Sequence, residues 1–309
     1  MLVQPVSAFP KEGDAQGRWV RQQSRFREWV GERAEPGRYH LYVSLACPWA
    51  SRAVITRKLK RLEDVLPMTV LDPVRDERGW RFTEEEPDPV SGFTFLKEAY
   101  EATQPGFDDR VTVPVLWDVQ EGRIVNNESA DVVRMLDGWS DEGPALAPPA
   151  LRDAIDELNA YIYANVNDGV YRAGFATSQE AYEEAFDALF CALDVLDGRL
   201  SARRYLLGDQ ITEADWRLFV TLVRFDVVYV SHFKCNLRRI ADYPNLSGYL
   251  RDLYQQPGIA DTVDFDHIKR HYFGTHPTIN PTRIIPKGPD TSGLLAPPGR
   301  EAVGRRAVA

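Results

Sequence analysis

A strand-helix-strand pattern near residue 40 constrains the fold of this chain more than any other feature. Residues 38–43 (Arg-Tyr-His-Leu-Tyr-Val) have the pattern of a strand, residues 51–60 that of an amphipathic helix, and residues 68–71 that of a second strand. Two strands joined through a helix are normally parallel neighbours in one sheet. We therefore expect an α/β domain that begins near residue 38.

The cysteine between the first strand and this helix is a candidate nucleophile. Pro48 suits a first helical turn, and the N–H groups of a helix start stabilise a thiolate at Cys47. Ala50 stands where a dithiol enzyme would carry its second cysteine, so an external thiol must resolve any mixed disulfide at Cys47. We expect the other two cysteines, Cys191 and Cys235, to be buried as small apolar residues.

A predicted hairpin follows, with strands at 111–118 and 123–126 separated by a short turn. Pro114 cannot donate to a sheet ladder, so it must lie at a strand start, at an edge or in a cis turn. A cis bond would leave the backbone of Val113 free to pair with an extended peptide. An edge proline without any functional role is the alternative.

Glu128 and Ser129 lie at the predicted start of a short helix that ends near residue 136. A serine at this position normally caps the helix backbone. In a binding site the same hydroxyl and the N–H groups of the first turn would hold a ligand carboxylate, and Glu128 would pair with an ammonium group. One helix start could therefore bind both charges of an α-amino acid.

Composition divides the chain into four parts. We expect an N-terminal extension at 1–37, whose stretch 25–30 packs on the first domain, and an α/β domain at 38–146 with an irregular insertion at 73–109. An all-helical domain at 150–273 and an extended, proline-rich arm at 274–309 follow, the last ten residues disordered.

The helical part contains a predicted capping box, in which Thr212 caps a helix and Asp215 reaches back to it. We assign Asp215 to folding and not to acid catalysis. The aromatic residues that follow at helical spacing should form core, namely Trp216, Phe219, Phe225 and Tyr229.

Charge and hydropathy exclude several function classes. The formal net charge of −9 argues against nucleic acid as a partner. No apolar run approaches the roughly 18 residues of a membrane span, and the N-terminus lacks a secretory pattern, so we expect a cytoplasmic protein with no membrane partner. His267, His271 and His276 have no further ligands at a recognisable spacing, so we expect no metal.

Together these motifs resemble the glutathione transferases with a thioredoxin-like domain, and more narrowly the glutathionyl-hydroquinone reductases, or Xi class. The resemblance covers about residues 20–288. It rests on Cys47-Pro48-Trp49-Ala50, Gly79-Trp80 with Phe82, 113–118, Asn127-Glu128-Ser129, 211–216, 224–229, 271–273 and 279–281.

The resemblance implies reduction of glutathionyl-hydroquinones, with Cys47 as nucleophile and glutathione as co-substrate, in a homodimer. By the family's pattern glutathione contacts Trp80, Val113, Glu128 and Ser129. The hydroquinone pocket is formed by Tyr163, Tyr171, His271 and Tyr272, of which Tyr171 and Tyr272 are the candidate catalytic groups. Trp80 could instead be a packed aromatic that holds the insertion.

Two other functions stay open. An omega-like thiol transferase, which reduces dehydroascorbate or glutathionylated protein, would share Cys47 but would not explain the Trp80 insertion or the Tyr272 segment. A non-enzymatic interaction module would need neither the nucleophile nor a glutathione site.

Overall fold

The computed structural model describes residues 12–31, 33 and 35–304 of the 309-residue chain. These residues form two compact units, and each unit combines segments from different parts of the sequence. The thiol unit consists of Gln22–Ala145 and Asp261–Thr275. The helical unit consists of Leu146–Ala260 with the described residues of 1–21 and 276–309. This division differs from the four parts expected from composition, because 12–21 and 261–275 each join the unit that is distant in sequence.

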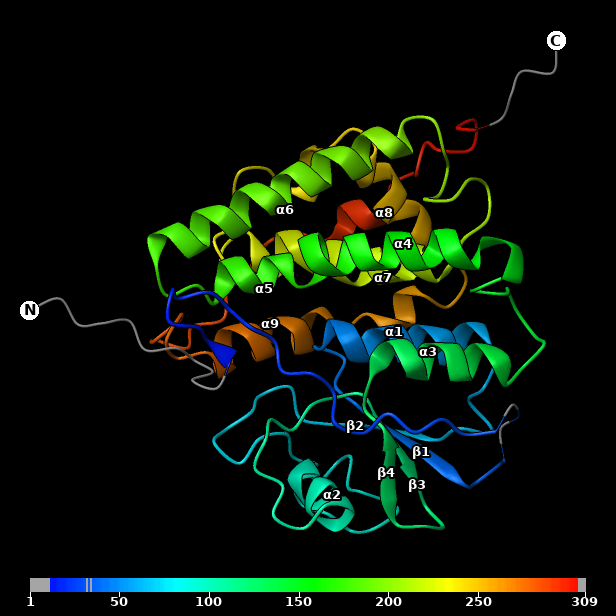
Figure 1. Cartoon of the computed structure of the whole chain (residues 1–309). Helices are drawn as coiled ribbons and strands as arrows, with labels where there is room; N and C mark the ends of the chain where they lie inside the picture. The colour runs from blue at the N-terminus through cyan, green and yellow to red at the C-terminus, as the bar shows by residue number, and fades with distance from the viewer. Residues whose placement is uncertain (1–11, 32, 34, 305–309) are drawn as a thin grey trace, which may run out of the picture. The chain divides into compact units, whose positions relative to one another are not determined.

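The thiol unit is built on a four-stranded mixed sheet with strand order β2-β1-β3-β4 (Figure 1). β1 (Tyr39–Val43) pairs in parallel with β2 (Met68–Val70), which confirms the predicted strand-helix-strand unit. β3 (Val115–Asp118) pairs antiparallel with β1 and with β4 (Arg123–Asn126), which confirms the predicted hairpin. All residues of β1 are buried, so the sheet forms the centre of this unit.

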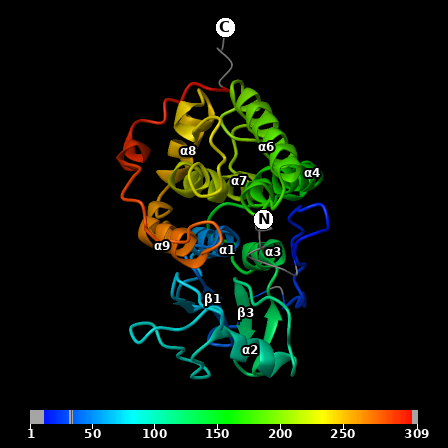
Figure 2. The same cartoon turned by 90° about the vertical axis from the view of Figure 1, so that its left-hand side faces the viewer.

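Four α-helices complete the described part of the thiol unit: α1 (Pro48–Leu59), α2 (Leu96–Thr103), α3 (Ser129–Gly138) and α9 (Phe265–Thr275). α1 and α3 lie side by side on one side of the sheet, and α2 lies on the other side (Figure 2). This arrangement buries the sheet on both faces.

The insertion 73–109 is more ordered than its composition predicts, because it contains α2. The Glu98 carboxylate accepts the backbone N–H groups of Thr94 (2.9 Å) and Phe95 (2.8 Å) and so caps the helix start. Leu96, Ala99 and Tyr100 have helical spacing and are all buried. The helix has only 8 residues within a segment rich in acids, proline and glycine, which hides this spacing in the sequence.

A buried carboxylate anchors the rest of the insertion to the sheet. The Tyr42 hydroxyl on β1 donates to Asp88 (2.8 Å). The other Asp88 hydrogen bonds come from the backbone N–H groups of Val90 (3.2 Å), Ser91 (3.0 Å) and Phe93 (3.1 Å). The insertion is therefore tied to the centre of the unit.

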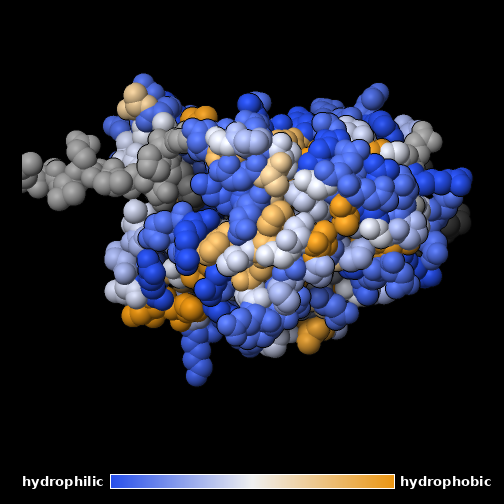
Figure 3. All heavy atoms as spheres, turned by 90° about the horizontal axis from the view of Figure 1, so that it is seen from below, coloured by the Kyte–Doolittle hydropathy of each residue, from blue (hydrophilic) through white to orange (hydrophobic). Residues whose placement is uncertain are grey.

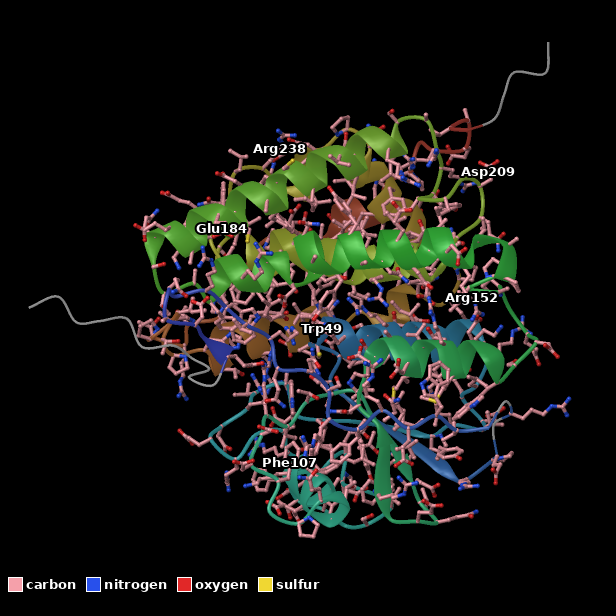
Figure 4. All side chains as sticks on the ribbon, viewed as in Figure 1. Trp49, Phe107, Arg152, Glu184, Asp209 and Arg238 are labelled. Atoms are coloured by element: carbon pink, nitrogen blue, oxygen red, sulfur yellow. The ribbon has the colours of Figure 1, made fainter. Side chains whose placement is uncertain are left out.

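The segment 22–31 packs on the thiol unit beyond β4. Arg27 forms an antiparallel bridge with Asn126, and the Glu28 N–H donates to the Val125 carbonyl (3.1 Å). The Phe26 ring lies 6.0 Å from Phe107, which Figure 4 labels near α2. The extension therefore covers one edge of the sheet.

The helical unit contains α4 (Arg152–Ile162), α5 (Gly169–Gly174), α6 (Gln179–Leu200), α7 (Glu213–Arg224) and α8 (Leu246–Tyr254). π-helical turns at Tyr163–Asn167 and Phe225–Tyr229 continue α4 and α7. None of the helices in the described part of the chain is long and apolar enough to cross a membrane.

The predicted capping box at the start of α7 is confirmed. The buried Asp215 carboxylate accepts the N–H of Thr212 (2.8 Å), the N–H of Leu206 (2.9 Å) and the hydroxyl of Tyr249 (2.9 Å). Asp215 therefore joins three segments of the helical core. The predicted core aromatics that follow it are all buried: Trp216, Phe219, Phe225 and Tyr229.

The C-terminal arm is mostly irregular, as its prolines predict, but order extends further along it than we expect from composition. Arg300 is buried, and its Nη2 donates to the carbonyls of Leu200 (2.8 Å) and Arg203 (2.6 Å) at the end of α6. Residues 305–309 lie outside the described part of the chain.

Figure 3 shows one face of the molecule, on which hydrophilic residues dominate and apolar residues form small groups. Scattered exposed apolar side chains are normal on a surface in contact with water.

Candidate active site

Cys47 occupies the N-cap position of α1, as its place before Pro48 predicts. Its carbonyl accepts the N–H of Ser51 (2.9 Å) and the hydroxyl of the same residue (3.0 Å). Cys47 is half-buried. Its sulfur lies at a helix start, where the backbone dipoles favour a negative charge.

The backbone of Val113 lies beside this sulfur. Cys47 Sγ is 3.7 Å from the Val113 carbonyl oxygen, and the Val113–Pro114 bond is cis. β3 begins at Val115, so Val113 precedes the sheet ladder. Tyr100 holds the preceding residue: its hydroxyl donates to the Thr112 carbonyl (2.8 Å) and accepts the Thr112 N–H (3.1 Å). The structure thus brings Cys47 and Val113 together, although they are far apart in sequence.

Glu128, and not Ser129, caps α3. The helix starts at Ser129, so residue 128 is the N-cap, and its Oε1 accepts the Ala130 N–H (3.0 Å). Its Oε2 accepts the hydroxyl of Ser24 (2.9 Å), which comes from the N-terminal segment. The capping role that we considered for Ser129 therefore belongs to its neighbour.

Arg52 adds a buried positive charge that the sequence patterns did not reveal. It lies on α1, about one turn beyond Cys47, and its Nη1 is 3.4 Å from Ser129 Oγ. Its guanidinium carbon lies 5.7 Å from the ring of Trp49, which Figure 4 labels at the start of α1. An arginine on the buried face of α1, between Ala50 and Ala53, is the signal that could have identified it.

Trp80 is nearly fully buried within the thiol unit and is packed by two basic side chains. The ring of His271, on α9, stacks on the indole at 5.0 Å with an interplanar angle of 15°. The guanidinium carbon of Arg75 lies 4.8 Å from the indole. His271 Nδ1 is 2.7 Å from the Pro73 carbonyl oxygen, so α9 holds the first part of the insertion.

The three candidate tyrosines are divided between the two units. Tyr272 follows His271 on α9 and is buried in the thiol unit. Tyr171 lies on α5 of the helical unit and packs against Phe233 (5.3 Å between ring centres). Tyr163 begins the π turn after α4 in the same unit and is half-buried.

The other two cysteines have different environments. Cys235 is buried as predicted, and burial raises the pKa of its thiol. Cys191 is exposed, contrary to our expectation, because it lies on the outward side of α6, next to the buried Ala192. Within residues 12–31, 33 and 35–304, no cluster of three or more His, Cys, Asp or Glu side chains could hold a metal ion.

Comparison with protein families gives two matches. Residues 46–138 match the model described as "Glutathione S-transferase, N-terminal domain", and residues 179–252 match "Glutathione S-transferase, C-terminal domain". The first match begins just before Cys47 and includes Trp80, Val113 and Glu128.

Two curated relatives match along nearly the whole chain. "Glutathionyl-hydroquinone reductase YqjG" of Escherichia coli is 51% identical, over 92% of this chain and 93% of the relative. "Glutathionyl-hydroquinone reductase PcpF" of Sphingobium chlorophenolicum is 49% identical, over 88% and 90%.

Solved structures give the same result. The glutathione-bound structure of YqjG from E. coli has a TM-score of 0.86 and covers 89% of this chain and 96% of its own. The glutathione-S-transferase Xi of Phanerochaete chrysosporium has a TM-score of 0.87 at 46% identity, with 92% and 96% covered.

Proposed function

The chain belongs to the glutathione transferase family, within it to the glutathionyl-hydroquinone reductases, and we propose that it reduces glutathionyl-hydroquinones to hydroquinones with glutathione as co-substrate. The observation that carries the proposal is the single thiol at the N-cap of α1, with Ala50 in place of a second cysteine. Such a thiol can accept a glutathionyl group but needs a second glutathione to release it.

In the first half-reaction the thiolate of Cys47 attacks the sulfur of the glutathionyl adduct. A bond forms between Cys47 Sγ and this sulfur, and the bond from sulfur to the ring carbon breaks. An intact aromatic ring is a poor leaving group, so attack takes place on a keto tautomer, from which the carbon leaves as an enolate. The ring carbon already bears a hydrogen in this tautomer, so protonation of the enolate oxygen yields the hydroquinone.

In the second half-reaction the thiolate of a free glutathione attacks the glutathionyl sulfur of the mixed disulfide. Oxidised glutathione leaves and the Cys47 thiolate is restored. Glutathione is the reductant, and the adduct gains one hydrogen in place of its glutathionyl group. A serine hydroxyl could not replace Cys47, because it does not attack sulfur usefully near neutral pH.

We assign glutathione binding to four residues of the thiol unit. Glu128 would pair with the ammonium group of the γ-glutamyl residue, and Ser129 with its carboxylate. The Val113 backbone would pair with the extended peptide, and Trp80 would contact the tripeptide along its indole. The 3.7 Å distance from Cys47 Sγ to the Val113 carbonyl supports this assignment.

We assign hydroquinone binding to Tyr163, Tyr171 and Tyr272, with Tyr171 and Tyr272 as the groups that supply the proton or hold the phenolic oxygens. We propose a different role for His271, which the family resemblance places in the hydroquinone pocket. Because it stacks on Trp80 and contacts the Pro73 carbonyl, we propose that it positions Trp80.

The test measures hydroquinone and oxidised glutathione formed from a glutathionyl-hydroquinone and glutathione. We expect Cys47→Ser to lose at least about 10³-fold in turnover and to form no mixed disulfide by mass spectrometry. Cys191→Ser is the matched control, because Cys191 is an exposed cysteine on α6 of the helical unit and should be dispensable. Full activity in Cys47→Ser would refute the mechanism, and faster turnover on dehydroascorbate would favour the omega-like alternative.

We also propose that the enzyme is a homodimer in the cytoplasm. The support is the family resemblance, together with the acidic composition of the chain. Sedimentation velocity of the full chain would measure its mass in solution, and a monomer would contradict the dimer.

A further inference from the structure

Arg21 has an unusual environment within the helical unit. Its side chain is only 17% exposed, and its Nε donates to Asp168 Oδ1 at 2.9 Å. Its guanidinium carbon lies 5.0 Å from the centre of the Tyr171 ring and 5.8 Å from that of Trp19. The N-terminal segment thus carries a cation to the aromatic face of a candidate catalytic residue.

Moving a guanidinium out of water costs free energy, and an uncharged side chain could fill the same space without this cost. Burial lowers the pKa of Arg21, but the Asp168 carboxylate and the phenols of Tyr163 and Tyr171 raise it above its ordinary value on balance. Arg21 is therefore permanently charged. The same attraction acts in the opposite direction on the two phenols, because a nearby cation favours a phenolate.

We propose that Arg21 is a positioning residue for the reaction: held by Asp168, it fixes the Tyr171 ring and stabilises the phenolate that Tyr171 becomes when it donates its proton. This inference rests on the proposed function, and on Tyr171 as the proton donor. It adds a residue from the N-terminal segment, which lies outside both matched family models.

The proton that Tyr171 donates is recovered within one reaction cycle. In the first half-reaction the O–H bond of Tyr171 breaks, and a new O–H bond forms on the enolate oxygen that is left when the ring carbon departs from the glutathionyl sulfur. In the second half-reaction the incoming glutathione must lose its thiol proton, and this proton restores the Tyr171 phenol. The reaction needs no oxidant or reductant beyond the two substrates.

The other groups around Tyr171 carry less charge. Tyr229, on the π turn after α7, faces it at 6.2 Å between ring centres, and Phe175 and Phe233 pack at 5.9 and 5.3 Å. The ring of His276 lies 5.2 Å from that of Phe175, and burial lowers the pKa of its partner His232 to about 4, so that His232 is neutral near pH 7. Arg172 is directed to the Ala164 carbonyl (3.4 Å).

The experiment titrates Tyr171 in the full chain by ultraviolet difference spectroscopy, as the absorbance of each protein minus that of the same protein carrying Tyr171→Phe. We expect Arg21→Gln to raise the midpoint of the Tyr171 titration by about one pH unit, and to lower kcat roughly tenfold with little change in KM for glutathione. Arg21→Lys, which keeps the charge, should stay within about half a unit of the unchanged protein.

Arg18→Gln is the matched control. Arg18 belongs to the same segment and pairs with Glu184 on α6 at 2.9 Å, but this pair is exposed, with side chains 48% and 55% accessible. Its loss should move neither the titration nor kcat.

Two results would overturn the inference. One is an unchanged Tyr171 midpoint in a folded Arg21→Gln protein. The other is an equal shift in Arg21→Gln and Arg21→Lys, which would show that the charge of residue 21 is not the cause. The titration requires no turnover. Failure of the proposed function would appear instead as a lack of activity in the protein without substitutions, and is therefore measured separately.

Discussion

Replacing Glu128 by glutamine tests the assignment of the glutathione site most directly. Glu128→Gln removes the negative charge but keeps a side-chain oxygen that can accept the Ala130 N–H, so the cap of α3 is retained. We expect the variant to fold normally and to bind glutathione more weakly, because the ammonium of the γ-glutamyl group loses its anionic partner.

The size of the loss follows from the surroundings of the carboxylate. Glu128 Oε1 accepts the Ala130 N–H and, at 3.5 Å, the Ser129 hydroxyl, and Oε2 accepts the Ser24 hydroxyl. An ionised carboxylate offers about four acceptor positions. Acceptor capacity for an ammonium therefore remains. Hydrogen bonds to charged groups are worth about 1.5–3 kcal/mol, and Glu128 is only half-buried, so we expect the lower part of this range. A loss of about 1.5–2 kcal/mol corresponds to a roughly 10- to 30-fold higher Kd.

The assay is calorimetric binding of two ligands to both proteins. The first is S-methylglutathione, which cannot form the mixed disulfide, and the second is its glutaryl analogue, identical except that it lacks the ammonium group. The unchanged protein should prefer S-methylglutathione, and Glu128→Gln should bind both ligands with similar affinity.

The reasoning is refuted if Glu128→Gln weakens both ligands equally, since that would indicate disruption of the site and not loss of an ion pair. It is equally refuted if the preference for the ammonium persists in the variant. Thermal unfolding of both proteins provides the control for folding.

The remaining predictions concern stability. Burial lowers the pKa of both His40 and His232 to about 4, so below pH 6.5 the unfolded chain binds protons that the folded chain does not. Stability should be complete above pH 6.5 and fall as the pH drops towards 4, by about 2 kcal/mol per histidine at pH 5; equal urea midpoints at pH 7.5 and pH 5 would contradict this. Asp215→Ala leaves the Tyr249 hydroxyl and two buried N–H groups without their acceptor, so we expect a loss of about 3 kcal/mol or more in the free energy of unfolding. A loss under about 1 kcal/mol would show that the core adapts.

The features that the sequence predicts correctly are those with a local signal. The parallel pair of β1 and β2, the N-cap position of Cys47 and the capping box of Asp215 all depend on residues within one short stretch. Periodicity and capping preferences act over a few residues, so a single sequence is enough to detect them.

The features that it misses depend on contacts between distant segments. Arg21 meets Asp168, 147 residues later, and Ser24 meets Glu128, 104 residues later. Nothing near Arg21 distinguishes it from a solvated arginine, because its partner is brought to it only by the folded chain. The stacking of His271 on Trp80 is hidden for the same reason.

The division of the chain between its two units limits how its gene can be divided or recombined. The polypeptide passes from one unit to the other at residues 21–22, 145–146, 260–261 and 275–276. No single cut in the gene can therefore separate the two units, and a fragment that ends before α9 lacks the histidine that stacks on Trp80. Recombination that exchanges one half of the gene therefore also exchanges parts of both units.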